Sequence, residues 1–260
     1  MRRLFAMLSR MIFVLALTLG AALAQTVSLS DSQALAIGRR IWKNECAGTV
    51  SGLTSWNRGE DFASLGIGHF IWYPAGGRGP FEESFPALVG FLASGGVKVP
   101  AWLRGPCPWK TRAAFMAEFD GPRLEQLRAL LADTVALQAR FCAQRLERAL
   151  PKMLAAAPKS ERERIRANFY RVAAEPMGMY ALIDYVNFKG EGVSPTERYA
   201  GQGWGLMQVL AAMKSGPALP EFARAANVVL TRRVENSPKA RHESQWLPGW
   251  RNRVAGYAGG

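Results

Sequence analysis

The sequence contains little histidine and little cysteine. Its 260 residues include two histidines and three cysteines, and no Cys-x-x-Cys pair occurs. Zinc sites are built from such ligands at short spacings, so this composition argues against a metal site. An odd number of cysteines leaves at least one thiol unpaired. We predict a disulfide between Cys107 and Cys142, and a buried free thiol at Cys46.

Long apolar runs are absent beyond the first 24 residues. That segment has arginines at positions 2, 3 and 10, then an uncharged, largely apolar run of 13 residues from Met11 to Leu23, with Ala22 and Ala24 at a cleavage motif. These are the regions of a secretory signal peptide, and spanning a bilayer takes about 20 apolar residues. We therefore expect a signal peptide over 1–24 and a mature protein in the periplasm or secreted, without stable membrane insertion. An uncleaved anchor is the alternative.

Acidic residues are fewer than basic ones, 20 against 33, which gives a net charge of +13. This excess suits an anionic partner, such as a cell-wall polymer, a membrane surface or nucleic acid. The basic residues are spread along the chain, so solvated helix faces are an alternative explanation. No internal repeat is visible, and eight tryptophans indicate a folded chain. We predict a single domain over 25–260.

The first predicted helix ends in a carboxylate. Ser30 or Asp31 can cap a helix that runs to about Glu45. Ile37, Ile41 and Glu45 are spaced by four, so they share the buried face of that helix. Partial shielding from water favours a protonated carboxyl group, which is what a general acid requires.

A polar hairpin is predicted next, with strands at 53–56 and 62–73 and a glycine-rich loop at 74–80. It carries Glu60, Asp61, Ser64 and His69. Cleavage of a glycosidic bond needs an acid for the leaving oxygen, and often a second polar group for a water or the cationic sugar. The stretch 45–73 supplies both kinds of group.

The rest of the chain is predicted to be helical. Apolar spacing indicates helices at 84–92, 122–150 (capped by Asp120), 177–186, 204–213, 221–234 and 250–257, with a capping box at 160–163 opening another. The expected fold class is α+β, mainly α, with one small β-hairpin after the first helix.

The run Ser64-Leu-Gly-Ile-Gly-His69 resembles the phage-type lysozymes, in which a catalytic Glu ends the first helix and a hairpin follows. Glu45 matches that acid, Ser64 the hydroxyl residue, and Gly66, Gly68 and His69 the glycines and histidine. The run ending at Gln208, Gly-Leu-Met-Gln, is similar to a motif of lytic transglycosylases, which share the lysozyme fold.

Two further segments, 180–187 and 250–253, look like helices of endolysins. The segment 95–159 has no obvious counterpart in that family and is interpreted as a helical insertion. A lysozyme-like fold is therefore the expectation for the whole domain.

The resemblance implies a monomeric, cofactor-free glycosidase that cuts peptidoglycan β-1,4 bonds, as a muramidase or a lytic transglycosylase, and binds no nucleic acid. Glu45 would be the general acid, with Asp61 and Ser64 as the other catalytic residues. The predicted substrate-binding residues are Glu60, His69, Trp56, Tyr73 and Gln208.

Alternatives remain for several of these assignments. Glu60 competes with Asp61 as the second acid. Trp56 and Tyr73 can stack on sugar rings or belong to the core, and His69 can be purely structural. The whole protein can also be a chitosanase-like enzyme acting on another amino-sugar polymer, or a non-catalytic periplasmic binding protein on the same scaffold.

Overall fold

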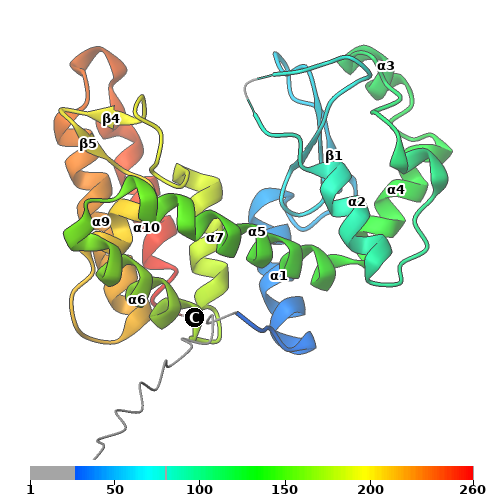
Figure 1. The fold of residues 1–260 in the computed structure, drawn as a ribbon. Helices are drawn as coiled ribbons and strands as arrows, with labels where there is room; N and C mark the ends of the chain where they lie inside the picture. The colour runs from blue at the N-terminus through cyan, green and yellow to red at the C-terminus, as the bar shows by residue number, and fades with distance from the viewer. Residues whose placement is uncertain (1–26, 80, 260) are drawn as a thin grey trace, which may run out of the picture.

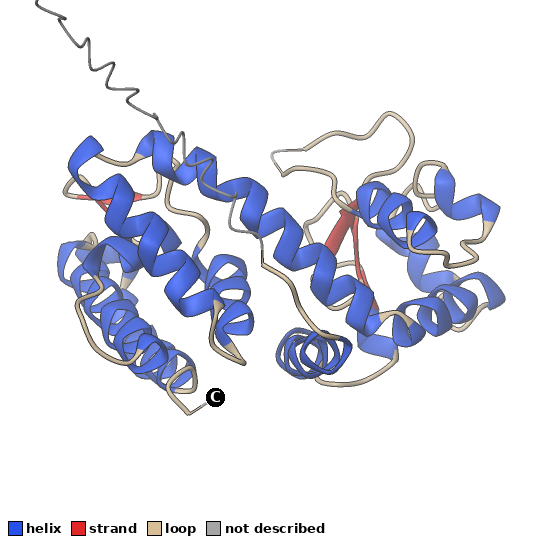
Figure 2. Cartoon of the chain, turned by 60° about the horizontal axis from the view of Figure 1, so that its bottom comes forward, coloured by secondary structure: helices blue, strands red, loops and turns tan. Residues whose placement is uncertain are grey.

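The computed structural model describes residues 27–79 and 81–259. Most of their helices and strands form two groups, which a long helix joins (Figure 1). The segment 51–133 forms one group, the β lobe, and the segment 162–255 forms the other, the helical lobe. Helix α5 (Val135–Ala156) runs from one lobe to the other, as Figure 2 shows. The predicted fold class, α+β and mainly α, is confirmed.

The predicted signal peptide, 1–24, lies outside the described residues. Within them, no helix combines the length and the apolar character needed to cross a bilayer.

Helix α1 (Asp31–Glu45) forms as the sequence predicts. Ser30 caps it and makes a reciprocal capping box with Gln33. Its buried face packs along α5, and Gly38 makes this possible, because a Cβ there would lie 2.6 Å from Val135 Cγ1. This close packing holds the end of α1, and so Glu45, against the helix that joins the lobes.

The hairpin prediction is wrong in one respect, because the sheet has three strands. They are β1 (Thr54–Ser55), β2 (Ala63–Leu65) and β3 (Phe70–Trp72), antiparallel in the order β1-β2-β3. The predicted strand 62–73 is broken by a turn from Gly66 to His69. Gly66 has φ +68° and His69 has φ +47°, both outside the range of a strand.

The predicted helix 122–150 is also two helices, α4 (Pro122–Asp133) and α5. Thr134, with φ −112° and ψ 19°, ends one and precedes the other. Its hydroxyl donates to Leu130 O at 2.7 Å and accepts from Gln138 Nε2 at 3.1 Å, which stabilises the break. The N-cap of α4 is Gly121 rather than the predicted Asp120.

The β lobe also contains α2 (Phe85–Ser94) and α3 (Arg112–Ala117), with 3-10 turns at Ser51–Leu53 and Ala101–Arg104. The helical lobe contains α6 (Arg162–Ala173), α7 (Gly178–Lys189), α8 (Leu206–Ala212), α9 (Ala218–Asn236), α10 (Leu247–Ala255) and a hairpin of β4 (Arg198–Tyr199) and β5 (Gln202–Gly203). The capping box predicted at 160–163 is absent; a 3-10 turn, Lys159–Glu161, precedes α6 there.

The segment 95–159, interpreted above as an insertion, contains α3, α4 and α5. Helix α5 packs against α1, α2, α6 and α7, so it belongs to the central core of the molecule.

The predicted disulfide between Cys107 and Cys142 is not formed. Cys46, Cys107 and Cys142 are all free and buried. Cys107 lies by the sheet, where its thiol contacts Trp109 O at 3.6 Å, whereas Cys142 lies on α5. The prediction rested on the number of cysteines, which carries no information on distance.

Candidate active site

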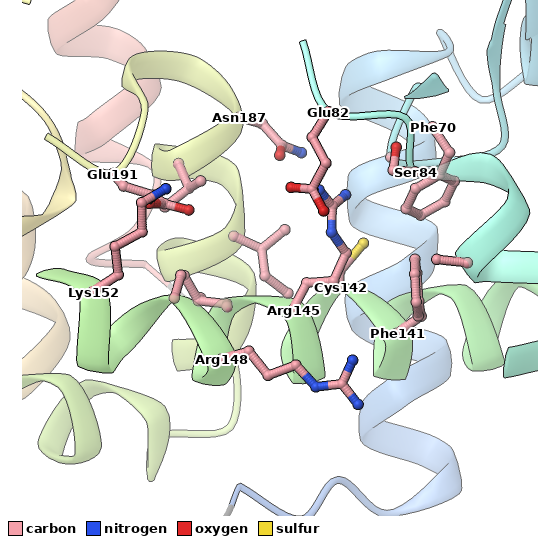
Figure 3. A pocket seen from close by; sticks show the side chains of 16 residues that line it. Phe70, Glu82, Ser84, Phe141, Cys142, Arg145, Arg148, Lys152, Asn187 and Glu191 are labelled. Atoms are coloured by element: carbon pink, nitrogen blue, oxygen red, sulfur yellow. The ribbon is translucent and has the colours of Figure 1, made fainter. Parts of the chain in front are cut away.

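A cleft of about 340 Å³ lies between the lobes above α5 (Figure 3). The β lobe supplies one wall, α5 the floor, and α7 with the loop after it the other wall. The lining residues are Gly68, Phe70, Glu82, Ser84, Ala87, Phe141, Cys142, Arg145, Leu146, Arg148, Ala149, Lys152, Ile183, Val186, Asn187 and Glu191.

Charged groups connect the floor of this cleft to both walls. Arg145 lies 3.7 Å from Glu82 on one wall, and Lys152 lies 3.5 Å from Glu191 on the other. The Oε2 atom of Glu191 is enclosed and has no hydrogen-bond partner among the described residues. The cleft therefore presents ionic groups of both signs to a ligand, as a site for a polar polymer would.

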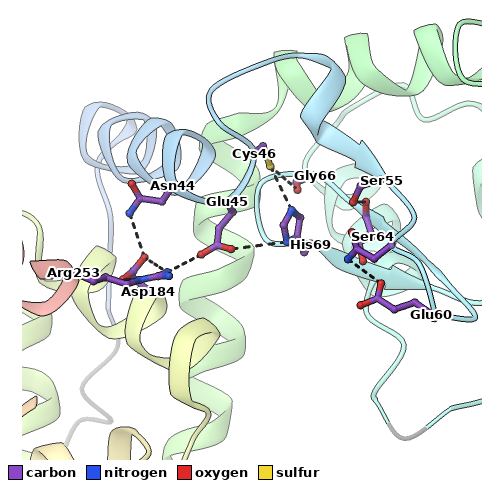
Figure 4. Close-up of polar contacts among 11 residues, drawn as sticks. Asn44, Glu45, Cys46, Ser55, Glu60, Ser64, Gly66, His69, Asp184 and Arg253 are labelled. Atoms are coloured by element: carbon purple, nitrogen blue, oxygen red, sulfur yellow. Dashed lines mark hydrogen bonds and ion pairs between the residues drawn. The ribbon is translucent and has the colours of Figure 1, made fainter. Parts of the chain in front are cut away.

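Glu45 is not itself one of the residues that line the cleft; it lies near it, where the end of α1 meets the helical lobe (Figure 4). Its Oε1 accepts a hydrogen bond from Arg253 Nη2 at 2.8 Å, and its side chain remains 21% exposed. Two residues of the cluster around Glu45, His69 and Asp184, each directly follow a residue that lines the cleft. Those lining residues are Gly68 and Ile183. Glu45 is thus fixed in direction and still reachable from solvent.

Arg253 is itself held by Asp184 of α7. The same Nη2 donates to Asp184 Oδ1 at 2.7 Å and Nε donates to Oδ2 at 2.8 Å. Burial lowers the pKa of Arg253, but the hydrogen bonds and charges of Asp184 and Glu45 outweigh burial and raise it. The guanidinium therefore stays charged at any working pH.

Asp184 is a positioning group. Its side chain is 1% exposed, and besides Arg253 it accepts from the Tyr257 hydroxyl and from Asn44 Nδ2. Burial, followed by the Asp184 charge, raises the pKa of Tyr257, so this phenol remains a donor. With its oxygens so occupied, Asp184 has none directed at a substrate.

His69 is the one predicted binding residue that the fold brings to Glu45. Its Nδ1 lies 3.9 Å from Glu45 Oε2, too far for a direct hydrogen bond, and its Nε2 lies 3.8 Å from Cys46 Sγ. A cysteine, a histidine and a carboxylate in sequence are the components of a thiol hydrolase. Burial, and then the charge of Glu45, raise the pKa of Cys46 to about 12, so no thiolate forms near neutral pH.

The other predicted catalytic residues do not join this cluster. Ser64 is buried in β2, and Figure 4 shows it with Glu60 beyond His69, away from Glu45. Glu60 accepts from Asn57 Nδ2 at 3.1 Å within its own turn. Asp61 is exposed, and no hydrogen bond or ion pair links its side chain to residues 27–79 or 81–259.

The predicted aromatic and amide binding residues lie elsewhere. Trp56 is buried against Phe115, and Tyr73 is buried with its hydroxyl donating to Phe81 O at 3.4 Å. Gln208 accepts from Gly205 N at 2.9 Å and lines a different hollow in the helical lobe. None of the three lines the cleft.

Sequence reasoning did not single out Asp184 or Arg253 as site residues, nor Glu82, Arg145 and Lys152 of the cleft. The available signal was weak: Asp184 and Arg253 fall in the segments 180–187 and 250–253 that resemble endolysin helices. Nothing in the sequence itself says that these two segments meet Glu45.

No group of three His, Cys, Asp or Glu side chains gathers into a candidate metal site in the described part of the chain. Comparisons with protein-family models, with curated proteins and with solved structures find no match for this chain. The case for a function therefore rests on the site.

Proposed function

We propose that the protein is an exported, lysozyme-like glycosidase that cuts the β-1,4 bonds of peptidoglycan, with Glu45 as the general acid. The observation that carries this proposal is the position of Glu45: a partly exposed carboxyl group at a helix end, beside an interlobe cleft, oriented by Arg253 at 2.8 Å. A glycan strand is long and narrow, and a cleft between two lobes suits it.

Arg253 and Asp184 hold Glu45 in place for the reaction. Arg253 makes two hydrogen bonds to Asp184, which balances its charge, so Arg253 stays paired while Glu45 gives its proton to the substrate. Glu45 then protonates the glycosidic oxygen as the bond to the sugar C1 breaks, and the carboxylate that results regains its ion pair with Arg253.

The fate of the cationic sugar defines two forms of this reaction. In hydrolysis, a water adds to C1 and loses a proton to a base. In a lytic transglycosylase, a hydroxyl group of the same sugar adds to C1 instead, and Glu45 takes up the proton that this hydroxyl loses. The isolated, exposed position of Asp61 and the buried position of Ser64 favour the second form, in which Glu45 acts alone.

Zymography of the mature protein on peptidoglycan, with product masses, tests the proposal. Glu45→Gln keeps the shape of the side chain and removes the proton, so we expect a rate loss of at least ~100-fold. Glu235→Gln, an exposed acid on α9, is the matched control and should be unchanged. A folded Glu45→Gln protein with wild-type activity would refute the mechanism.

Binding to peptidoglycan without turnover by the wild type would favour the non-catalytic alternative. Cleavage of chitosan in preference to peptidoglycan would favour the chitosanase-like alternative.

A further inference from the structure

A second hollow, of about 560 Å³, lies in the helical lobe where the end of α5, the β4–β5 hairpin, α8 and α9 meet. Its lining is rich in polar groups, and two of them are arginines, Arg198 on β4 and Arg232 on α9. Gln208, predicted from the sequence to bind substrate, also lies here.

Both arginines have unused donors. Arg198 makes one long hydrogen bond, to Gly201 O at 3.5 Å, and Arg232 makes one to Gly203 O at 3.4 Å. The Nε atom of Arg232 is enclosed and has no hydrogen-bond partner among the described residues. An enclosed N–H without a partner is costly, and a ligand atom or a water can complete it.

Neither arginine pairs with an acid within the described ranges, 27–79 and 81–259. By contrast, two other arginines of α9 form ion pairs. Arg224 lies 2.6 Å from Glu221, and Arg233 lies 2.8 Å from Glu243. The one acid lining the hollow, Glu161, is already paired with Arg164 at 3.1 Å. The hollow is therefore positive, and planar guanidinium groups suit a carboxylate, which they can bind through paired N–H donors.

The hollow adjoins the cleft in two places. Lys152 lines the cleft and Ala156 lines the hollow, one turn apart on α5, or about 6 Å along the axis. On the other side, Glu191 lines the cleft, while Gln208 of the hollow donates to Gly192 O at 3.0 Å. Neighbouring residues thus line the cleft and the hollow, which is the arrangement that a group branching from a polymer in the cleft would need.

We propose that Arg198 and Arg232 bind a carboxylate on a peptide substituent of the glycan whose backbone occupies the interlobe cleft. This inference rests on the proposed function and deepens it, since it makes the enzyme selective for glycan that carries acidic side branches.

The experiment measures binding by calorimetry to the Glu45→Gln protein, which holds substrate without cutting it. The probes are a soluble peptidoglycan fragment that carries its peptide, the same fragment after enzymatic removal of the peptide, and inorganic phosphate. Arg198→Gln and Arg232→Gln are each expected to weaken binding of the first probe at least about tenfold, since each removes a charge-assisted contact. Binding of the second probe should not change.

Arg123→Gln, which removes an exposed charge from α4 of the other lobe, is the matched control and should bind like the parent. Arg232→Lys keeps the charge without the planar fork, so an intermediate loss is expected. Melting curves identify any variant that fails to fold. Because Arg198 lies at the surface of the lobe, Arg198→Gln tests the inference even if the Arg232 variant does not fold.

Equal affinity of the parent and both glutamine variants for the peptide-bearing fragment would overturn the inference. So would binding of phosphate that both glutamine variants lose while the two fragments bind the parent equally, which would make the hollow a general anion site. Cleavage by the wild type is scored separately by zymography, so failure of the proposed function and failure of this inference give different results.

Discussion

Glu45 and Asp184, on α1 and α7, accept hydrogen bonds from the same nitrogen of Arg253, at 2.8 and 2.7 Å. The two carboxylates have different surroundings. Glu45 is partly exposed beside the cleft, whereas Asp184 is 1% exposed and has its oxygens occupied by Arg253, Tyr257 and Asn44. In the proposed mechanism, this difference fits proton transfer by Glu45 and support by Asp184.

Removing Arg253 tests that support. Arg253→Gln leaves Asp184 buried without its cation, so we expect a loss of about 3 kcal/mol in the free energy of unfolding, together with a large loss of activity. Urea denaturation measures the free energy of unfolding, and zymography measures the activity. Arg251→Gln, an exposed neighbour that bonds Asn227 and Thr231, should cost less than about 1 kcal/mol. Equal effects of the two changes would contradict the assigned role of Arg253.

Asp61→Asn separates hydrolysis from transglycosylation. Because Asp61 is exposed and apart from the cluster, the variant should keep its rate within about twofold, and anhydro-sugar ends should appear among the products. Mass spectrometry of timed peptidoglycan digests measures both the rate of product formation and the type of sugar end. Reducing ends together with a rate loss of ~100-fold would restore Asp61 as a catalytic base.

The buried thiols predict a loss of stability at high pH. Burial raises the pKa of Cys46, Cys107 and Cys142 to about 12, from an ordinary value of 9.0. A raised pKa in the folded state gives stability that is complete below pH 9 and is lost as the pH rises towards 12. At pH 10 the raised pKa of each thiol should lower the free energy of unfolding by about 1.4 kcal/mol. Urea unfolding at pH 8 and at pH 10 measures this difference.

Cys46→Ala should show a smaller fall between these two pH values than the wild type, and it should keep its glycosidase activity. Loss of activity in a folded Cys46→Ala protein would instead point to the thiol hydrolase that burial of Cys46 argues against.

Gly38→Ala tests the contact between α1 and α5. The added Cβ would lie 2.6 Å from a Val135 side-chain atom and 2.8 Å from its carbonyl oxygen, so we expect destabilisation of about 2 kcal/mol. Gly90→Ala is the control, because nothing lies within 4 Å of its Cβ on helix α2, and it should stabilise the protein by up to about 1 kcal/mol. Thermal melts of the two variants should move in opposite directions.

The first helix was predictable from its own residues, whereas breaks within predicted elements and contacts between distant residues were not. Helix α1 follows from Ser30, Gln33 and the spacing of Ile37 and Ile41, all within its own span. The break at Thr134 was missed because the apolar spacing continues through it, and the break is made by side-chain hydrogen bonds. Trp56 is buried, which is the alternative that the sequence left open, because a sequence does not distinguish a buried aromatic ring from an exposed one.

Arg253 lies on α10 and its partner Glu45 on α1, 208 positions earlier in the chain. Contacts between such distant residues form late, because a large loop must close before they can stabilise anything. The first helix can fold early from its own caps and spacing, but its carboxyl group lacks its guanidinium partner until α10 docks. We therefore expect the complete site to assemble only when α1 has met the folded helical lobe.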